Sequence, residues 1–131
     1  MLEYLWVGIG GAVGSMLRYW LSGLVANTRI GEVFPLGTMV INVSGSFVIG
    51  ILGAITRPGG RFDPHWRILV TQLLMVGLCG GFTTFSSFSL QTLNLARDGQ
   101  WLYAGLNITL SVVLCLVAVW LGFALGEMSN R

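Results

Sequence analysis

The residues of this chain with the clearest chemical potential form one polar stretch inside a long uncharged segment. Residues 68–96 carry no charged side chain, and within them residues 80–89 read Gly-Gly-Phe-Thr-Thr-Phe-Ser-Ser-Phe-Ser. Two adjacent glycines and five hydroxyl residues make a poor uninterrupted helix. The stretch therefore predicts a backbone break, where freed carbonyl groups could bind a cation and freed N–H groups an anion. A kink relieved by Ser and Thr side chains is the competing interpretation.

Polar side chains also interrupt two other uncharged segments, residues 34–56 and 99–126. Asn42 lies near the middle of the first segment. In the second, Asn107, Ser111 and Cys115 recur at every fourth position and so share one face of a helix. A polar side chain in lipid must find a partner or face water. Taken alone, this face favours hydrogen bonds between helices, and a polar track along a pore is the alternative.

These residues must be positioned by helices that cross a membrane. The chain has 131 residues, of which 54% are hydrophobic and 9% charged, whereas a soluble domain is about 25% charged. Crossing a bilayer takes about 20 apolar residues. The sequence predicts an all-α membrane protein, a single transmembrane domain over residues 1–131. Its four helices are expected at about 2–26, 34–56, 64–97 and 99–127, with the third broken mid-membrane.

The third segment supplies a further argument for that break. Its 29 uncharged residues would form a continuous helix of about 43 Å at about 1.5 Å per residue. The hydrocarbon core of a bilayer is only about 30 Å thick. Non-helical backbone at membrane depth persists only where it is buried in protein or lines water. A break there is thus a functional signal on physical grounds.

Local signals mark the ends and the packing of these helices. The loops are expected at residues 27–33, 57–61 and 97–99, and Asp63 is a predicted N-cap with Pro64 in the first turn. Small residues four apart allow helix backbones to approach closely in lipid. Such pairs are Gly10 with Gly14, Gly122 with Gly126, and Ser46 with Gly50.

The charges restrict the function without fixing the orientation. The net charge of +2, with arginine as every basic residue, does not indicate a nucleic-acid partner. A cytoplasmic N-terminus would place four arginines on the same side and Arg29 and Arg97 on the other, with Arg18 near that second side. The four are Arg57, Arg61, Arg67 and Arg131. This bias is weak under the positive-inside rule. Either the orientation is hard to predict from charge, or the chain inserts both ways.

Residues 77–88 read Gly-Leu-Cys-Gly-Gly-Phe-Thr-Thr-Phe-Ser-Ser-Phe. This segment resembles the signature of Fluc (CrcB) fluoride channels, written roughly G-x-x-G-G-x-T-T-F-S-S/T-F. Residues 14–19, 35–38 with 40–42, and 121–123 agree with the family in the same order, so the resemblance spans most of the chain. It implies a fluoride-selective channel in the prokaryotic inner (plasma) membrane. Such a channel exports fluoride passively and relieves its toxicity.

The resemblance also implies an assembly and roles for individual residues. The family is an antiparallel, dual-topology homodimer with two fluoride pores at its interface. Its pore phenylalanines map onto Phe85 and Phe88, and its fluoride-donating asparagine maps onto Asn42. A central structural Na⁺ is held by backbone carbonyls that map onto Gly80 and Thr83 of both subunits.

The remaining family positions complete an anion pathway. The helix-four polar track maps onto Asn107, Ser111 and Cys115, and hydroxyl groups such as that of Thr84 are further donors. Donors of this kind replace the water that fluoride loses, and aromatic ring edges carry positive quadrupole charge. Arg18 either lies in a vestibule and attracts the anion, or extends to the lipid headgroups.

Two other functions are alternatives for a chain with four membrane helices. A small multidrug-resistance exporter also has four helices, but it couples to protons through a carboxylate at membrane depth. Every acidic residue here lies at a predicted end or loop: Glu3, Glu32, Asp63, Asp98 and Glu127. A structural subunit of a larger complex would explain the glycines but not the broken third helix. The chain lacks a nucleophile–base pair or a Cys/His cluster, so the sequence does not predict an enzyme.

Overall fold

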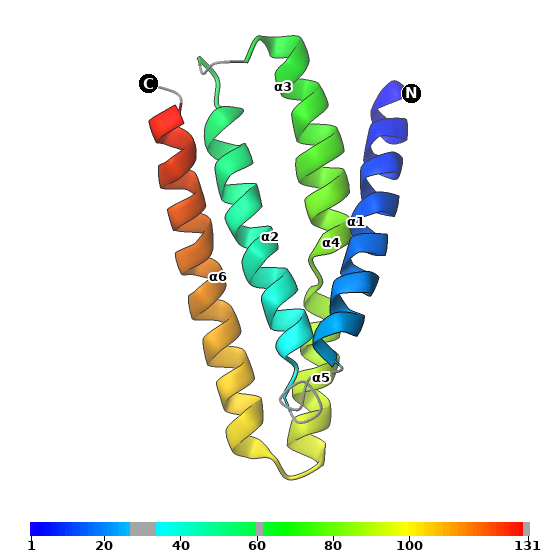
Figure 1. Cartoon of the computed structure of the whole chain (residues 1–131), viewed down its shortest axis with the longest axis vertical. Coiled ribbons are helices and arrows are strands. Elements are labelled where there is room, and N and C mark those ends of the chain that lie inside the picture. The colour runs from blue at the N-terminus through cyan, green and yellow to red at the C-terminus, as the bar shows by residue number, and fades with distance from the viewer. Residues whose placement is uncertain (27–33, 60–61, 130–131) are drawn as a thin grey trace.

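The architecture comes from a computed structural model that describes residues 1–26, 34–59 and 62–129. The predicted loop at 27–33, and Arg61 and Arg131 of the charge count, lie outside the described residues. All described secondary structure is helical. Four rods run alternately up and down, with residues 1 and 129 at the same end of the molecule (Figure 1). This agrees with the predicted all-α membrane protein of four helices.

The first, second and fourth rods are single helices. α1 spans Leu2–Ala26, α2 spans Leu36–Ile55 and α6 spans Trp101–Ser129. α6 begins two residues later than expected because Gly99, with φ of 76°, forms the preceding turn. Within the described residues, α2, α6 and the composite third rod at Pro64–Arg97 are long and apolar enough to cross a membrane. α1 has the length, at 25 residues, but it carries Arg18 and many glycines.

The third rod is built from four consecutive pieces. α3 covers Pro64–Val70, a π-helical segment η1 covers Thr71–Cys79, α4 covers Gly80–Phe82 and α5 covers Phe85–Arg97. Asp63 caps the start of α3 as predicted, its Oδ1 accepting from the backbone N–H groups of His65 at 3.0 Å and Trp66 at 3.1 Å. The π-helical segment was not anticipated from the sequence.

The predicted break is present, but it lies later and is shorter than the polar stretch. Only Thr83 and Thr84 leave the helical conformation, with ψ of 156° and 116°. The glycine pair that motivated the prediction is itself helical. Its second member serves packing, since a Cβ on Gly81 would lie 3.0 Å from the Cα of Gly11 in α1. The hydroxyl-rich residues that follow start a regular helix.

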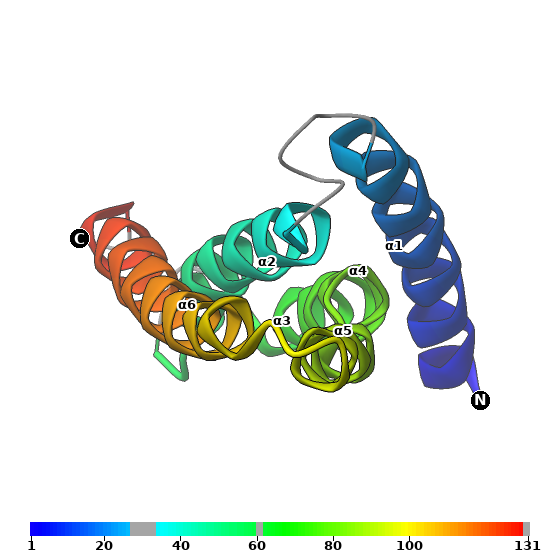
Figure 2. The same ribbon diagram turned by 90° about the horizontal axis from the view of Figure 1, so that it is seen from below.

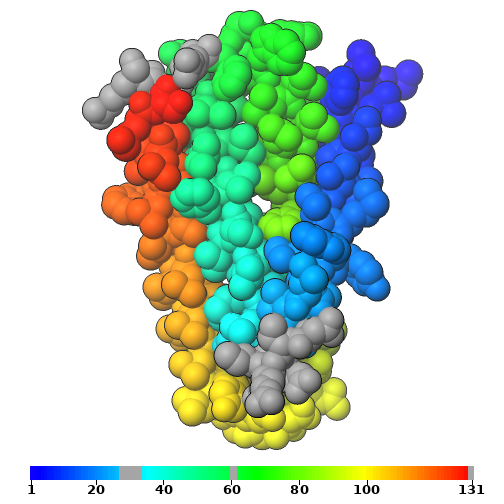
Figure 3. Space-filling view, viewed as in Figure 1, coloured from blue at the N-terminus to red at the C-terminus, as the bar shows by residue number. Residues whose placement is uncertain are grey.

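Small residues bring the rods together in two pairs. α1 packs on η1 and α4, while α2 packs on α6, and α2 separates α6 from α1 (Figures 2 and 3). A Cβ on Gly14 would lie 2.9 Å from the backbone nitrogen of Phe82, and one on Gly50 would lie 2.9 Å from that of Phe123. Gly10 and Gly122 face the neighbouring backbone equally closely. The predicted packing role of these glycines is therefore confirmed.

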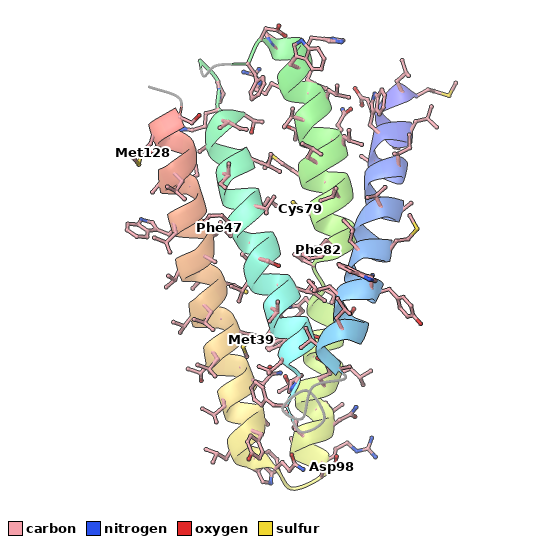
Figure 4. All side chains as sticks on the ribbon, in the orientation of Figure 1. Met39, Phe47, Cys79, Phe82, Asp98 and Met128 are labelled. Carbon is pink, nitrogen blue, oxygen red and sulfur yellow. The ribbon has the colours of Figure 1, made fainter. Side chains whose placement is uncertain are left out.

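An ion pair joins two helices at one end of the bundle, and a tight turn closes the other end. At one end, Arg57 after α2 forms an ion pair with Glu127 of α6, and its guanidinium lies 5.4 Å from the centre of the Phe123 ring. At the other end, Asp98 lies in the tight turn that joins α5 to α6 (Figure 4). Among the described residues, the middle of the bundle contains no ion pair.

Candidate functional site

The break in the third rod is held by a side chain from α2. The Asn42 Nδ2 donates to the Thr84 carbonyl at 3.0 Å, and the Thr84 backbone N–H donates to the Asn42 Oδ1 at 2.8 Å. The carboxamide thus pairs with an extended residue as a neighbouring strand would. Two such bonds contribute about 2 kcal/mol, with each worth about 1 kcal/mol. Asn42 uses one of its two N–H groups here and keeps a second donor.

Thr84, the residue that Asn42 binds, also caps α5. The Thr84 Oγ1 accepts the backbone N–H of Ser87 at 3.2 Å and lies 3.1 Å from the Ser87 hydroxyl. The first turn of a helix has N–H groups without helical partners, and its end carries partial positive charge. In α5 this positive end lies at membrane depth beside Asn42. It is an electrostatic setting that favours an anion.

An open cavity of about 290 Å³ adjoins the break. Its walls combine amide, hydroxyl, thiol and aromatic groups from α2, the break, α5 and α6. They are Asn42, Gly45, Ser46, Ile49, Thr83, Thr84, Phe85, Phe88, Ser111, Val112 and Cys115. Among these wall residues there is no carboxylate. The cavity can therefore offer hydrogen-bond donors to an anion without repelling it.

The two phenylalanines are neighbours on one side of α5. Their ring centres lie 5.3 Å apart with planes inclined at 46°. Phe85 is 78% exposed, whereas Phe88 is half-buried. An apolar ring that is this exposed gains little from burial in a single chain. Its exposure becomes understandable where another surface covers it.

Not all of the predicted helix-four track reaches the cavity. Ser111 and Cys115 line it, but Asn107 does not. Asn107 is 1% exposed, and its Nδ2 donates to the Thr92 Oγ1 at 2.8 Å. Its Oδ1 accepts the Ser111 hydroxyl at 3.4 Å. The structure thus separates the three residues into two cavity residues and one buried between helices.

A second, more polar cavity of about 520 Å³ lies between α1, the start of α2 and α5. Arg18 lies in its wall with Thr84, Ser87 and Gln91, which agrees with the vestibule alternative for this arginine. The Gln91 Oε1 is buried without a hydrogen-bond partner among the described residues. Thr84 borders both the arginine-lined cavity and the cavity that contains the phenylalanines.

The same break frees two backbone carbonyl groups. In a continuous helix the Gly80 carbonyl would accept from the Thr84 N–H, and that of Thr83 from the Ser87 N–H. Here the Thr84 N–H binds Asn42, and the Ser87 N–H binds the Thr84 hydroxyl. Both oxygens thereby lose their helical donors at the negative end of α4.

Comparison with known proteins decides the family. The family model described as CrcB-like protein, Camphor Resistance (CrcB), matches residues 5–123. The chain belongs to the CrcB family. A fluoride-specific ion channel FluC of Rhodospirillum rubrum is 61% identical over 99% of this chain and 98% of its own length. That of Methylocella silvestris is 54% identical over 99% of this chain and 97% of its own length. That of Paramagnetospirillum magneticum is 55% identical over 100% of both chains.

The CrcB chain contains site residues that sequence reasoning missed. Gly45 and Ser46 line the first cavity, Ser87 and Gln91 line the second, and Thr92 binds Asn107. Helical spacing could have found two of them. Thr92 lies four residues after Phe88 and Gln91 lies four after Ser87, so each shares a helix face with a residue of the signature. Gly45 gave no local signal, because its role is to admit the Thr83 and Phe82 side chains.

Proposed function

We propose that this CrcB chain is a channel that passes fluoride selectively and passively across the bacterial inner membrane, and that it is not an enzyme. The first cavity carries the proposal: donors, phenylalanine edges and a helix N-terminus meet there without a carboxylate in the wall. The full-length relatives named fluoride-specific ion channels support the choice of fluoride. Passive export through such a channel would relieve fluoride toxicity.

The route follows from the order of the groups. Arg18 attracts the anion into the second cavity, which hydroxyl groups line. The anion then passes Thr84, which lines both cavities, and enters the first cavity. There the free N–H of Asn42, the Ser111 hydroxyl and the ring edges of Phe85 and Phe88 replace its water. Cys115 continues the path with a weaker donor. Asn107 does not line the path, but it influences the path by accepting the hydrogen bond of the Ser111 hydroxyl.

We further propose that the working unit is an antiparallel homodimer. Phe85 is 78% exposed and lines the first cavity, which is open. A second copy would close the cavity and bury the phenylalanine. The weak arginine bias agrees with insertion in both directions.

The freed carbonyl groups suit a structural Na⁺. Hard cations take oxygen ligands, and the Gly80 and Thr83 oxygens have both lost their helical donors. Gly80 is exposed, as a site shared with a partner requires. Two oxygens from each copy would surround the ion and offset the negative ends of two helices. Its role would be to join the copies.

Purified protein in liposomes is expected to release trapped fluoride when a potassium ionophore balances charge, and to retain chloride. The vestibule arginine admits any anion, so the selectivity arises where the small ion fits between donors. Ion-selective electrodes measure both rates. Chloride efflux at the same rate as fluoride efflux would contradict the proposed selectivity. Efflux that requires a proton gradient would favour the exporter, although within the described residues no carboxylate lines either cavity.

Both orientations are expected in the membrane. Reporter fusions at the C-terminus should show activity on both sides, because antiparallel assembly from one chain requires two insertions. Exchange of Arg97, exposed at the end of α5, for glutamine should change the ratio of orientations. A single orientation for the wild-type chain would contradict antiparallel assembly while leaving fluoride conduction open.

A further inference from the structure

We propose that Thr92 and Asn107 are a positioning pair that fixes α5, and with it Phe85 and Phe88, against α6. The inference rests on the proposed fluoride conduction and adds a role outside the ion path. In this role Asn107 orients the groups that meet the ion and does not meet it directly. Its partner Thr92 carries no assigned function in the sequence analysis.

The contact itself is close and shielded. The Asn107 Nδ2 lies 2.8 Å from the Thr92 Oγ1, and Asn107 is 1% exposed. The Thr92 hydroxyl donates in turn to the Phe88 carbonyl at 2.8 Å. Because the hydroxyl gives its single hydrogen to Phe88, its lone pairs are free to accept from Asn107. The amide is thereby linked through one oxygen to the backbone of a pore phenylalanine.

The packing of α5 explains why this link matters. No residue of α5 is fully buried, so apolar packing holds it less firmly than the other rods. At its start, Asn42 holds Thr84. Among the described residues of α5 itself, Thr92 makes the side-chain hydrogen bond that reaches another helix. Two anchors, one at each side of the phenylalanines, prevent α5 from rotating about its axis.

The chain of bonds also reaches the cavity wall. Ser111, 6% exposed, donates its hydroxyl hydrogen to the Asn107 Oδ1 at 3.4 Å. Ser111 therefore directs its hydrogen away from the cavity in this arrangement. The bond is long and hence weak, so an anion in the cavity can compete for the hydrogen. The strong bond to Thr92 keeps the amide in place while Ser111 exchanges partners.

The test compares two substitutions at one position. Thr92→Val keeps the shape and removes the hydroxyl, whereas Thr92→Ser keeps the hydroxyl. Thr71→Val is the matched control, because the Thr71 hydroxyl also donates to the carbonyl four residues earlier, at 2.8 Å, but binds no second helix. Fluoride and chloride efflux from proteoliposomes and the unfolding temperature are measured for each, with the wild type establishing conduction.

We expect Thr92→Val to slow fluoride efflux roughly three- to tenfold, the factor that corresponds to one neutral hydrogen bond. The ratio of fluoride to chloride efflux should fall as well. Thr92→Ser should restore both, and Thr71→Val, which loses only a bond within its own helix, should leave the ratio unchanged. Unchanged efflux in Thr92→Val would overturn the pair and return Asn107 to the role of a direct donor.

A double substitution separates positioning from general destabilisation. Asn107→Leu and Thr92→Val break the same bond, so the efflux of the double variant should match that of the slower single variant. Multiplied effects would show that the two residues act independently and would contradict the pair. Failure of the wild type to conduct fluoride would instead reject the proposed function, so the two failures are distinguishable.

Discussion

Replacing Asn42 with aspartate abolishes fluoride efflux while the chain still inserts and folds: this is the largest expected effect of a single substitution. The carboxylate has no N–H group, so it loses the bond to the Thr84 carbonyl that now measures 3.0 Å. It can still accept the Thr84 N–H, which lies 2.8 Å from the Asn42 Oδ1. The break therefore keeps one of its two contacts, and the second donor toward the cavity disappears.

The size of the loss follows from charge. A carboxylate about 4 Å from fluoride repels it by about 4 kcal/mol at an effective dielectric constant of about 20. Since about 1.4 kcal/mol is a factor of ten, efflux should fall by nearly a thousandfold. Electrode recordings from proteoliposomes of equal protein content measure this loss directly.

Asn94→Asp is the matched control, because it replaces the same amide with a carboxylate. Asn94 lies on the exposed surface of α5 and lines neither cavity. It should conduct like the wild type. An Asn42→Asp protein that conducts at the wild-type rate would show that the ion does not approach this amide, and the first cavity would lose its main donor. A protein that fails to reconstitute would point to the structural bond with Thr84 instead.

The sequence predicted that the third rod breaks, but for a partly wrong reason. Glycine pairs and hydroxyl residues weaken a helix on average, yet the two glycines are helical and the break is limited to Thr83 and Thr84. Its position is set by Asn42, which is 42 residues away in the chain. A local pattern cannot reveal this partner, because a helix opens where another group replaces its lost hydrogen bonds.

The same limit applies to the polar face of α6. Spacing correctly placed Asn107 and Ser111 on one buried face, which continues through Ala118 and Gly122. Spacing could not distinguish a cavity residue from one that binds a neighbouring helix, because both are polar residues at the same positions of the helical repeat. The separation depends on where α5 lies. The π-helical segment is a further example: it contains Gly77, which lies against Gly10 of α1, and no local pattern predicts its conformation.

Replacing either pore phenylalanine with isoleucine should slow fluoride efflux about two- to tenfold. Isoleucine fills similar space but has no ring edge with positive quadrupole charge, and a contact of this class contributes about 0.5–1.5 kcal/mol beyond burial. The Phe85 substitution should leave the fold of the single chain unchanged, since that ring is 78% exposed there. Phe88 is half-buried and should also lose some stability. Efflux and unfolding temperature are therefore measured together.

Phe34→Ile is the matched control, because the Phe34 ring, just before α2, lines neither cavity. The centre of this ring lies 6.2 Å from that of Tyr103. A normal rate in both pore variants would mean that the ion passes without touching the rings. Their exposure would then reflect dimer packing, and isoleucine at Phe85 should weaken the dimer. Loss of efflux with an intact dimer would instead assign the rings to the ion, because only an electrostatic role distinguishes a ring edge from an aliphatic side chain of similar size.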